Sequence, residues 1–245
     1  MWSPETLLML AAIFLLAGGV KGVVGLGLPT VSLALMTLSF GLPTAMALLL
    51  LPSLVTNLWQ AFAGAHLFAV LKRIWPLLLL ATLLIPLGGL LLRGDDLTLL
   101  TALLGVSLVL YGGLGLMQAR LTLSRRQEAW AGPLVGAANG VLTGMTGSFV
   151  VPGVLYLQSI GLQRDALIQA MGLLFTLSTL GLGVSLGGLD LLSEDLMLLS
   201  AFAVVPALAG MRLGQALRQR ISEVLFRRLL FVSLLILGVG LMLGR

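Results

Sequence analysis

The chain has 245 residues, of which 59% are hydrophobic and 9% are charged, with a formal net charge of +5. This composition and a mean hydropathy of +1.13 exclude a soluble domain and predict an all-α, polytopic membrane protein. Several apolar runs approach or exceed the ~20 residues that a helix needs to cross the hydrocarbon core. The basic excess is better explained by loops that set orientation in the lipid bilayer than by nucleic acid binding.

The first half of the chain, residues 1–118, is expected to form one repeat. Its opening segment, 5–40, is interrupted by glycines and a proline and predicts a broken helical hairpin, either re-entrant or made of two short spans. Three transmembrane helices are expected after it, over 43–64, 74–92 and 97–118. An arginine-rich polar segment, 119–130, then forms the expected cytoplasmic linker.

The second half, residues 131–245, is expected to follow the same plan. A hairpin of two short helices is predicted over 131–160, and three transmembrane helices over 167–187, 196–211 and 229–244. A shift of 122 residues superposes glycines in the same order: Gly18, Gly22 and Gly25 fall on Gly140, Gly144 and Gly147. A shift of 120 places Pro86 on Pro206. Ordered recurrence of this kind predicts an internal duplication.

The loop charges predict that the two repeats have inverted topologies. Lys72 and Arg73 make one first-half loop basic, whereas its second-half counterpart contains Asp190, Glu194 and Asp195. The positive-inside rule therefore places equivalent loops on opposite sides of the membrane. We expect both termini outside the cytoplasm and three segments inside it: 65–73, 119–130 and 211–228.

The glycine-rich stretch 18–29 organises the first hairpin. Irregular backbone at membrane depth is tolerated where it lines a cavity, so Gly22, Gly25 and Gly27 are expected to lie close to a substrate. Pro29, like Pro152 in the second half, fits the first position of a new helix, whose N–H groups attract anions. The alternative is that the glycines only permit close packing of helices.

Lys21 is the charge in this stretch that no flanking polar loop explains. A cation inside a bilayer is costly and usually paired, yet no aspartate or glutamate lies in the apolar segments. A bound anion would supply the missing negative charge, and we expect Lys21 to hold it. The alternative is that Lys21 extends to a polar edge or rests on carbonyl groups at a helix end.

Other polar residues in apolar segments complete the expected substrate site. Thr56, Asn57 and Gln60 lie within one helical turn of each other, so they would line a cavity or form hydrogen bonds between helices. We expect the two glycine stretches to meet inside the membrane, where the second one would contribute Asn139, Thr143, Gly144, Thr146, Gly147 and Ser148. Gln169 is a weaker candidate.

Enzymatic chemistry is not expected. The sequence has no His-Glu-x-x-His zinc motif, no cysteine and no pair of carboxylates inside the membrane. Ser148 follows a glycine, but the one histidine, His66, is expected near the cytoplasmic rim. We therefore predict no catalytic residue, no metal site and no cofactor.

The string Gly19-Val20-Lys21-Gly22-Val23-Val24-Gly25-Leu26-Gly27, followed by Phe40–Pro43 and Pro52–Gln60, resembles the sulfite exporter TauE/SafE family. This family is also called the toluene-sulfonate uptake permease family. The resemblance extends over the whole chain, because the second stretch and the two-half plan are also similar. Phe149 departs from the pattern, since the family often has a small residue there, so the second tip is expected to be more closed.

The resemblance implies a carrier in the bacterial inner membrane that moves sulfite, an organosulfonate or a related small sulfur-containing anion. Inverted repeats with broken segments favour transport by alternating access. The alternative is a non-transporting membrane subunit that serves as an assembly or sensor partner. The coupling ion, proton or sodium, and the oligomeric state stay open at this point.

Overall fold

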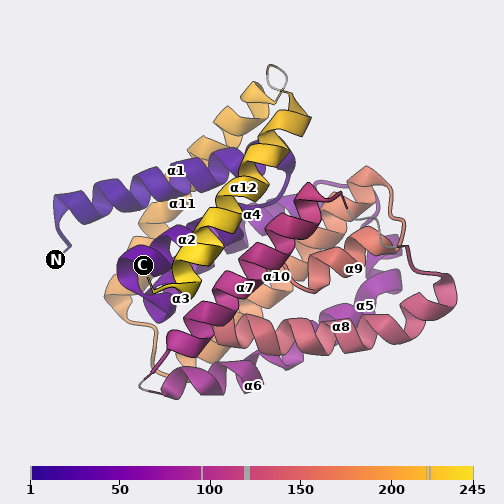
Figure 1. Ribbon diagram of the computed structural model, residues 1–245, viewed down its shortest axis with the longest axis horizontal. Helices are drawn as coiled ribbons and strands as arrows, with labels where there is room; N and C mark the ends of the chain where they lie inside the picture. The colour runs from indigo at the N-terminus through magenta and orange to yellow at the C-terminus, as the bar shows by residue number, and fades with distance from the viewer. Residues whose placement is uncertain (1, 95, 119–121, 219, 221, 245) are drawn as a thin grey trace.

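The computed structural model describes residues 2–94, 96–118, 122–218, 220 and 222–244, and all regular secondary structure in these ranges is helical (Figure 1). This confirms the predicted all-α class. The helices are α1 (Pro4–Val24), α2 (Leu28–Phe40), α3 (Leu42–Leu48), α4 (Leu50–Phe62), α5 (Leu67–Leu83), α6 (Ile85–Gly89), the 3₁₀ helix η1 (Leu90–Arg93), α7 (Thr98–Leu116), α8 (Arg125–Thr146), α9 (Gly153–Ser159), α10 (Arg164–Gly187), α11 (Glu194–Leu217) and α12 (Glu223–Met242).

Membrane-spanning length is reached by six segments among the described residues: Pro4–Val24, Leu67–Arg93, Thr98–Leu116, Arg164–Gly187, Glu194–Leu217 and Val224–Met242. The pair α3 and α4 is long and apolar enough to make a seventh span, although the two helices meet at an angle of 45°. The predicted polytopic membrane protein is therefore confirmed by the length and composition of these helices.

The break in the first hairpin is shorter than the sequence predicted. Helix α1 has 21 residues and continues through Gly18, Lys21 and Gly22. Only residues 25–27 leave helical geometry, with φ values of +85° at Gly25 and +108° at Gly27. Pro29 lies in the first turn of α2, as expected. The expectation of two short helical arms is wrong for α1, because packing against a neighbouring helix keeps its glycines helical.

The second hairpin shows the same correction. Helix α8 has 22 residues and begins at Arg125, inside the expected linker 119–130. It ends at Gly147, whose φ is +71°. Pro152 is the residue before α9 and not its first helical residue. At about 1.5 Å per residue, α1 and α8 are each about 30 Å long, so only the second arm of each hairpin is short.

Four helix pairs form the frame of the molecule. Helix α1 packs against α11, α8 against α5 and α6, α7 against α12, and α4 against α10. Figure 1 shows α8 beside α5 and α6 along one side of the molecule. These pairs, and not one central helix, build the core.

Glycines allow two of these pairs to approach closely. A Cβ atom at Gly18 or Gly22 would overlap a backbone carbonyl oxygen of α11, and one at Gly144 would overlap the carbonyl oxygen of Ile85. A Cβ at Gly140 would lie 2.8 Å from the carbonyl oxygen of Ala81. At these four positions the glycines permit close packing of helices, which was the alternative interpretation of the glycine stretches.

Basic side chains gather at one end of the molecule, which we call the basic end and define by His66, Lys72, Arg73, Arg125 and Arg218. The first four line one surface depression, and His66 and Arg218 share a second one. Both marked chain termini lie in the opposite part of Figure 1. The starts of α5 and α8 and the end of α11 therefore lie on a common side.

At the basic end, an ion pair joins Arg73 of α5 to Glu128 of α8. Arg73 donates from Nε to one oxygen of Glu128 over 2.7 Å and from Nη2 to the other over 2.9 Å, and it also donates to the carbonyl oxygen of Ile160. The Arg73 hydrogen bond holds the pKa of Glu128 below its ordinary value.

Candidate functional site

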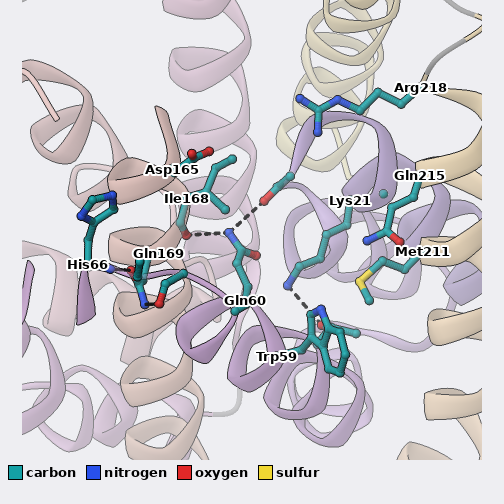
Figure 2. A pocket seen from close by; sticks show the side chains of 16 residues that line it. Lys21, Trp59, Gln60, His66, Asp165, Ile168, Gln169, Met211, Gln215 and Arg218 are labelled. Atoms are coloured by element: carbon teal, nitrogen blue, oxygen red, sulfur yellow. Dashed lines mark hydrogen bonds between the residues drawn. The ribbon is translucent and has the colours of Figure 1, made fainter. Parts of the chain in front are cut away.

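A cleft of about 490 Å³ lies between α1, α4, α10 and α11, with His66, Asp165 and Arg218 where it reaches the basic end (Figure 2). Its lining combines backbone at glycines with amide, hydroxyl and charged side chains. The residues are Lys21, Gly22, Gly25, Thr56, Trp59, Gln60, Ala63, Gly64, Ala65, His66, Asp165, Ile168, Gln169, Met211, Gln215 and Arg218.

Lys21 provides the buried positive charge of this cleft. It lies in the last turn of α1 and is only 3% exposed. Its Nζ donates to Thr56 Oγ1 over 3.2 Å and to Asn57 Oδ1. Among the described residues, no aspartate or glutamate forms an ion pair with Lys21. This geometry does not match the alternative in which Lys21 extends to a polar edge.

Helix α4 presents the polar wall that faces Lys21. Thr56 and Asn57 are fully buried and Gln60 is 8% exposed, whereas Trp59 on the same helix is 67% exposed. The Gln60 Nε2 group donates to the carbonyl oxygens of Gly25 over 3.0 Å and Ile168 over 2.8 Å. Gln60 thereby joins the end of α1 to the start of α10, while the apolar side of α4 points outward.

Several buried polar atoms of this wall have no partner among the described residues. They are Ser53 Oγ, Asn57 Nδ2 and Gln60 Oε1. An unpaired polar atom in the protein interior costs about 1–3 kcal/mol, and native structures contain few of them. Gln60 lines the cleft and Asn57 bonds to Lys21, so these two unpaired atoms suit a small, oxygen-rich polar ligand beside Lys21.

Gln169 closes the wall at the start of α10. Its Nε2 donates to the carbonyl oxygens of Ala61 over 2.7 Å and Gly64 over 3.0 Å, and its Oε1 accepts from the His66 N–H over 2.9 Å. Gln169 therefore shapes the rim of the cleft by holding the turn that follows α4.

The second glycine stretch does not line this cleft. Asn139 Oδ1 accepts from the Gly153 N–H over 2.9 Å, and the Thr143 hydroxyl donates to the carbonyl of Ser148 over 2.9 Å. The Thr146 hydroxyl donates to the carbonyl of Leu142.

The remaining candidates outside the cleft are glycines and their neighbours. A Cβ at Gly147 would meet Met46 and Leu33, one at Gly144 would meet α6, and one at Gly27 would meet Val20. The shared site expected from two meeting stretches is therefore not formed in this conformation. Lys21, Gly22, Gly25, Thr56 and Gln60 come together in the cleft, and Asn57 joins them through its hydrogen bond to Lys21.

One wall of the cleft was missed by the sequence reasoning. Met211, Gln215 and Arg218 from the end of α11 face Lys21 across the cleft. The available signal was the pair Gly210 and Gly214, whose spacing matches that of Gly18 and Gly22. These glycines pack against the carbonyl groups of Leu15 and Gly19, which brings the end of α11 to the cleft.

The comparisons with known proteins agree with the resemblance seen in the first glycine stretch. A family model described as "Sulfite exporter TauE/SafE" matches residues 10–241. No curated protein and no solved structure matches the chain. Because the family match covers nearly all of the sequence, the chain belongs to the sulfite exporter TauE/SafE family, whose members are membrane transporters and not enzymes.

Proposed function

We propose that this protein is a secondary transporter that moves a small sulfur-containing anion, such as sulfite or an organosulfonate, across the bacterial inner membrane. The observation that carries the proposal is Lys21, a buried cation beside a cleft with no carboxylate paired to it among the described residues. A transported anion accounts for such a charge, because its negative charge would pair with the Lys21 ammonium. The Asn57 amide, with its open Nδ2, adds a donor for an oxyanion.

Alternating access between two inverted repeats is the proposed mechanism, and the glycine contacts support it. Gly18 and Gly22 pack on Ala207 and Met211, whereas Gly140 and Gly144 pack on Ala81 and Ile85. Adding 122 to the numbers of the first-half glycines gives the second-half glycines, and adding 126 to the numbers of Ala81 and Ile85 gives Ala207 and Met211. The same pair of contacts therefore occurs twice, with the roles of the halves exchanged.

Exchange of the halves also relates other contacts of the frame. Gly112 packs on the carbonyl of Phe231, and Gly238 packs on the carbonyl of Gly105. A shift of 126 carries Gly112 onto Gly238 and Gly105 onto Phe231, so the two contacts correspond. These contacts support a shift of 126 in this region, in place of the shift of 120 that pairs Pro86 with Pro206. Matching interfaces of this kind are expected of two inverted repeats, and alternating access follows from such a symmetry.

The cleft would open to the cytoplasm in this conformation. The positive-inside rule assigns the basic end to the cytoplasmic side, and the cleft reaches that end at His66 and Arg218. Both termini would then be periplasmic. Cysteine introduced at Asp96 or Asp190 should be labelled from the periplasm, and cysteine at Arg125 should not. The wild-type chain has no cysteine, so labelling at Arg125 from outside would reverse the orientation.

A flux assay in proteoliposomes tests the transport function. Wild-type protein should move sulfite or a simple sulfonate down its gradient, and Lys21→Met should not. Lys72→Met is the matched control, because Lys72 is the other lysine of the chain and is exposed at the basic end. Equal flux in the wild type and the Lys21 variant would refute the assigned role, and absence of flux in the wild type would favour a non-transporting subunit.

A further inference from the structure

The charge of the cleft restricts the charge of its ligand, an inference that rests on the proposed function. Among the described residues that line the cleft, the charged side chains are Lys21 at its buried end and Asp165 and Arg218 at its rim. The two rim charges have opposite signs, so the charged side chains of the lining sum to about one positive charge. A ligand beside Lys21 therefore meets about one positive charge, and a dianion would retain an uncompensated charge in a largely desolvated place.

The open hydrogen-bonding atoms add a second restriction. Both amide hydrogens of Gln60 are used, because Nε2 donates to the carbonyls of Gly25 and Ile168. Its Oε1 is buried and accepts no hydrogen bond from the described residues. In Figure 2 this oxygen turns to the side of the amide that faces Lys21. The ligand site thus includes an acceptor as well as donors.

An anion without a hydrogen of its own cannot satisfy that acceptor. Two oxygen lone pairs facing each other repel, so a fully deprotonated oxyanion would meet Gln60 Oε1 unfavourably. A ligand that carries an O–H beside its negative oxygens would pair with all of the open atoms. Its charged oxygens would accept from Lys21 Nζ and Asn57 Nδ2, and its O–H would donate to Gln60 Oε1.

We propose that the cleft binds a singly charged oxyanion that keeps one proton, of the hydrogensulfite type, in preference to a dianion. A sulfonate has the right charge but lacks the O–H, so it binds more weakly than hydrogensulfite. Sulfate has a similar size and the wrong charge. The protonation state of the ligand, and not its size alone, then decides what the cleft accepts.

Calorimetric titration of the purified full-length protein tests this with sulfite, methanesulfonate and sulfate at about pH 6 and about pH 8.5. Sulfite loses its remaining proton near neutral pH, whereas methanesulfonate is a monoanion throughout. Sulfite affinity should fall by about tenfold per pH unit above neutrality. Methanesulfonate affinity should change less than about twofold, and sulfate should bind at least about tenfold more weakly than sulfite at the lower pH.

Each contrary result has a separate meaning. Sulfite affinity that is equal at both pH values, or sulfate binding as tight as sulfite binding, overturns the preference for a protonated monoanion. A parallel loss of methanesulfonate binding at high pH also overturns it, since a group of the protein, and not the ligand, would then account for the pH dependence. If none of the sulfur anions binds in a manner that depends on Lys21, the proposed function itself fails.

A variant pair examines the role of Gln60. Gln60→Lys keeps a donor toward the carbonyls of Gly25 and Ile168, but it removes the Oε1 acceptor and adds a positive charge. Sulfate affinity should therefore rise. The affinity for sulfite should also depend less on pH. Gln215→Lys adds the same charge on the α11 wall but leaves the Gln60 oxygen in place, so it should also raise sulfate affinity but flatten the pH dependence for sulfite less than Gln60→Lys does. Equal behaviour of the two variants would contradict the role of Gln60. The wild-type titrations decide the proposal if Gln60→Lys does not fold.

Discussion

The two glycine stretches occupy matching places in the chain but differ in what surrounds them. The first ends α1 at Gly25, beside the cleft, where a Cβ would make only ordinary contact with Ile168 at 3.8 Å. The second ends α8 at Gly147, where a Cβ would lie 2.7 Å from Met46 and 3.3 Å from Leu33. Phe149 fills the second break and packs on Phe175 with ring centroids 6.0 Å apart. One break borders a cavity and the other is packed shut.

Hydrogen bonding separates the two stretches in the same way. In the first, Lys21 reaches across to α4 and bonds with Thr56 and Asn57. In the second, Thr143 takes the position of Lys21 and bonds within its own turn, to the carbonyl of Ser148. The comparison shows that a broken helix does not make a binding site by itself. The break that borders the cleft lies beside a charged residue, Lys21, whose hydrogen-bond partners are on another helix.

The largest expected effect on anion binding comes from exchanging this charge. Lys21→Met should weaken anion binding by about 10–100-fold, corresponding to ~1.5–3 kcal/mol for hydrogen bonds to a charged group. The empty protein should be as stable as the wild type or more stable, because a buried cation without a partner is costly. Anion affinity and Tm measured on the same purified sample check both statements.

Thr143→Met is the matched substitution in the second stretch. It should leave anion affinity within about twofold of the wild type but lower the Tm, since it removes a buried hydrogen bond worth ~1 kcal/mol. Comparable losses of affinity at both positions would contradict the assignment of the site to the first stretch.

A second comparison uses alanine at the two breaks. Both Gly25 and Gly147 have positive φ, so alanine costs about 1–2 kcal/mol at either one. Gly147→Ala should cost about 1–3 kcal/mol more, because its Cβ must displace Met46 and Leu33. Thermal unfolding of the two variants gives the difference. A larger loss of stability in Gly25→Ala would mean that the first break is also tightly packed.

Sequence reasoning found the polar half of the site because polar residues in apolar segments are anomalous wherever they occur. Lys21, Thr56, Asn57 and Gln60 stood out for this reason. The α11 wall was not predicted, since the choice of partner helix depends on how glycine surfaces fit together in three dimensions. The same fit explains why Gly18 and Gly22 stay helical.

The second stretch was predicted to belong to the site because it is rich in polar side chains, and a sequence does not show which partners such side chains bond to. Its hydroxyl and amide groups have the composition of a binding surface, but in this conformation they bond to backbone groups of the second hairpin itself. Asn139 Nδ2 and Ser148 Oγ lack partners among the described residues, so these atoms are available to another conformation. Composition alone does not say in which state a polar group is used.

The smallest expected effect concerns the Arg73–Glu128 pair, which packs the second hairpin against α5. Glu128→Gln should lower the stability by about 1 kcal/mol near neutral pH. The pKa of Glu128 is lowered in the folded protein from its ordinary value of 4.5. The stabilisation is therefore present above about pH 4.5 and is lost as the pH falls through the lower folded-state pKa. Tm values of both proteins should converge in acid, and a constant difference would contradict this origin.

Lys21 is buried and has no carboxylate partner in the described part of the chain, and this has a consequence for how membrane voltage would act on the proposed carrier. If its ammonium stays charged, the empty carrier moves with one positive charge, and a bound monoanion cancels it. A potential of 100 mV acts on a full elementary charge with about 2.3 kcal/mol. A membrane that is negative inside would then hold the empty carrier with Lys21 facing the cytoplasm, while the loaded carrier would move without regard to voltage. Under the proposed mechanism, binding of substrate inside the cell would release the carrier from that hold and would thereby favour export.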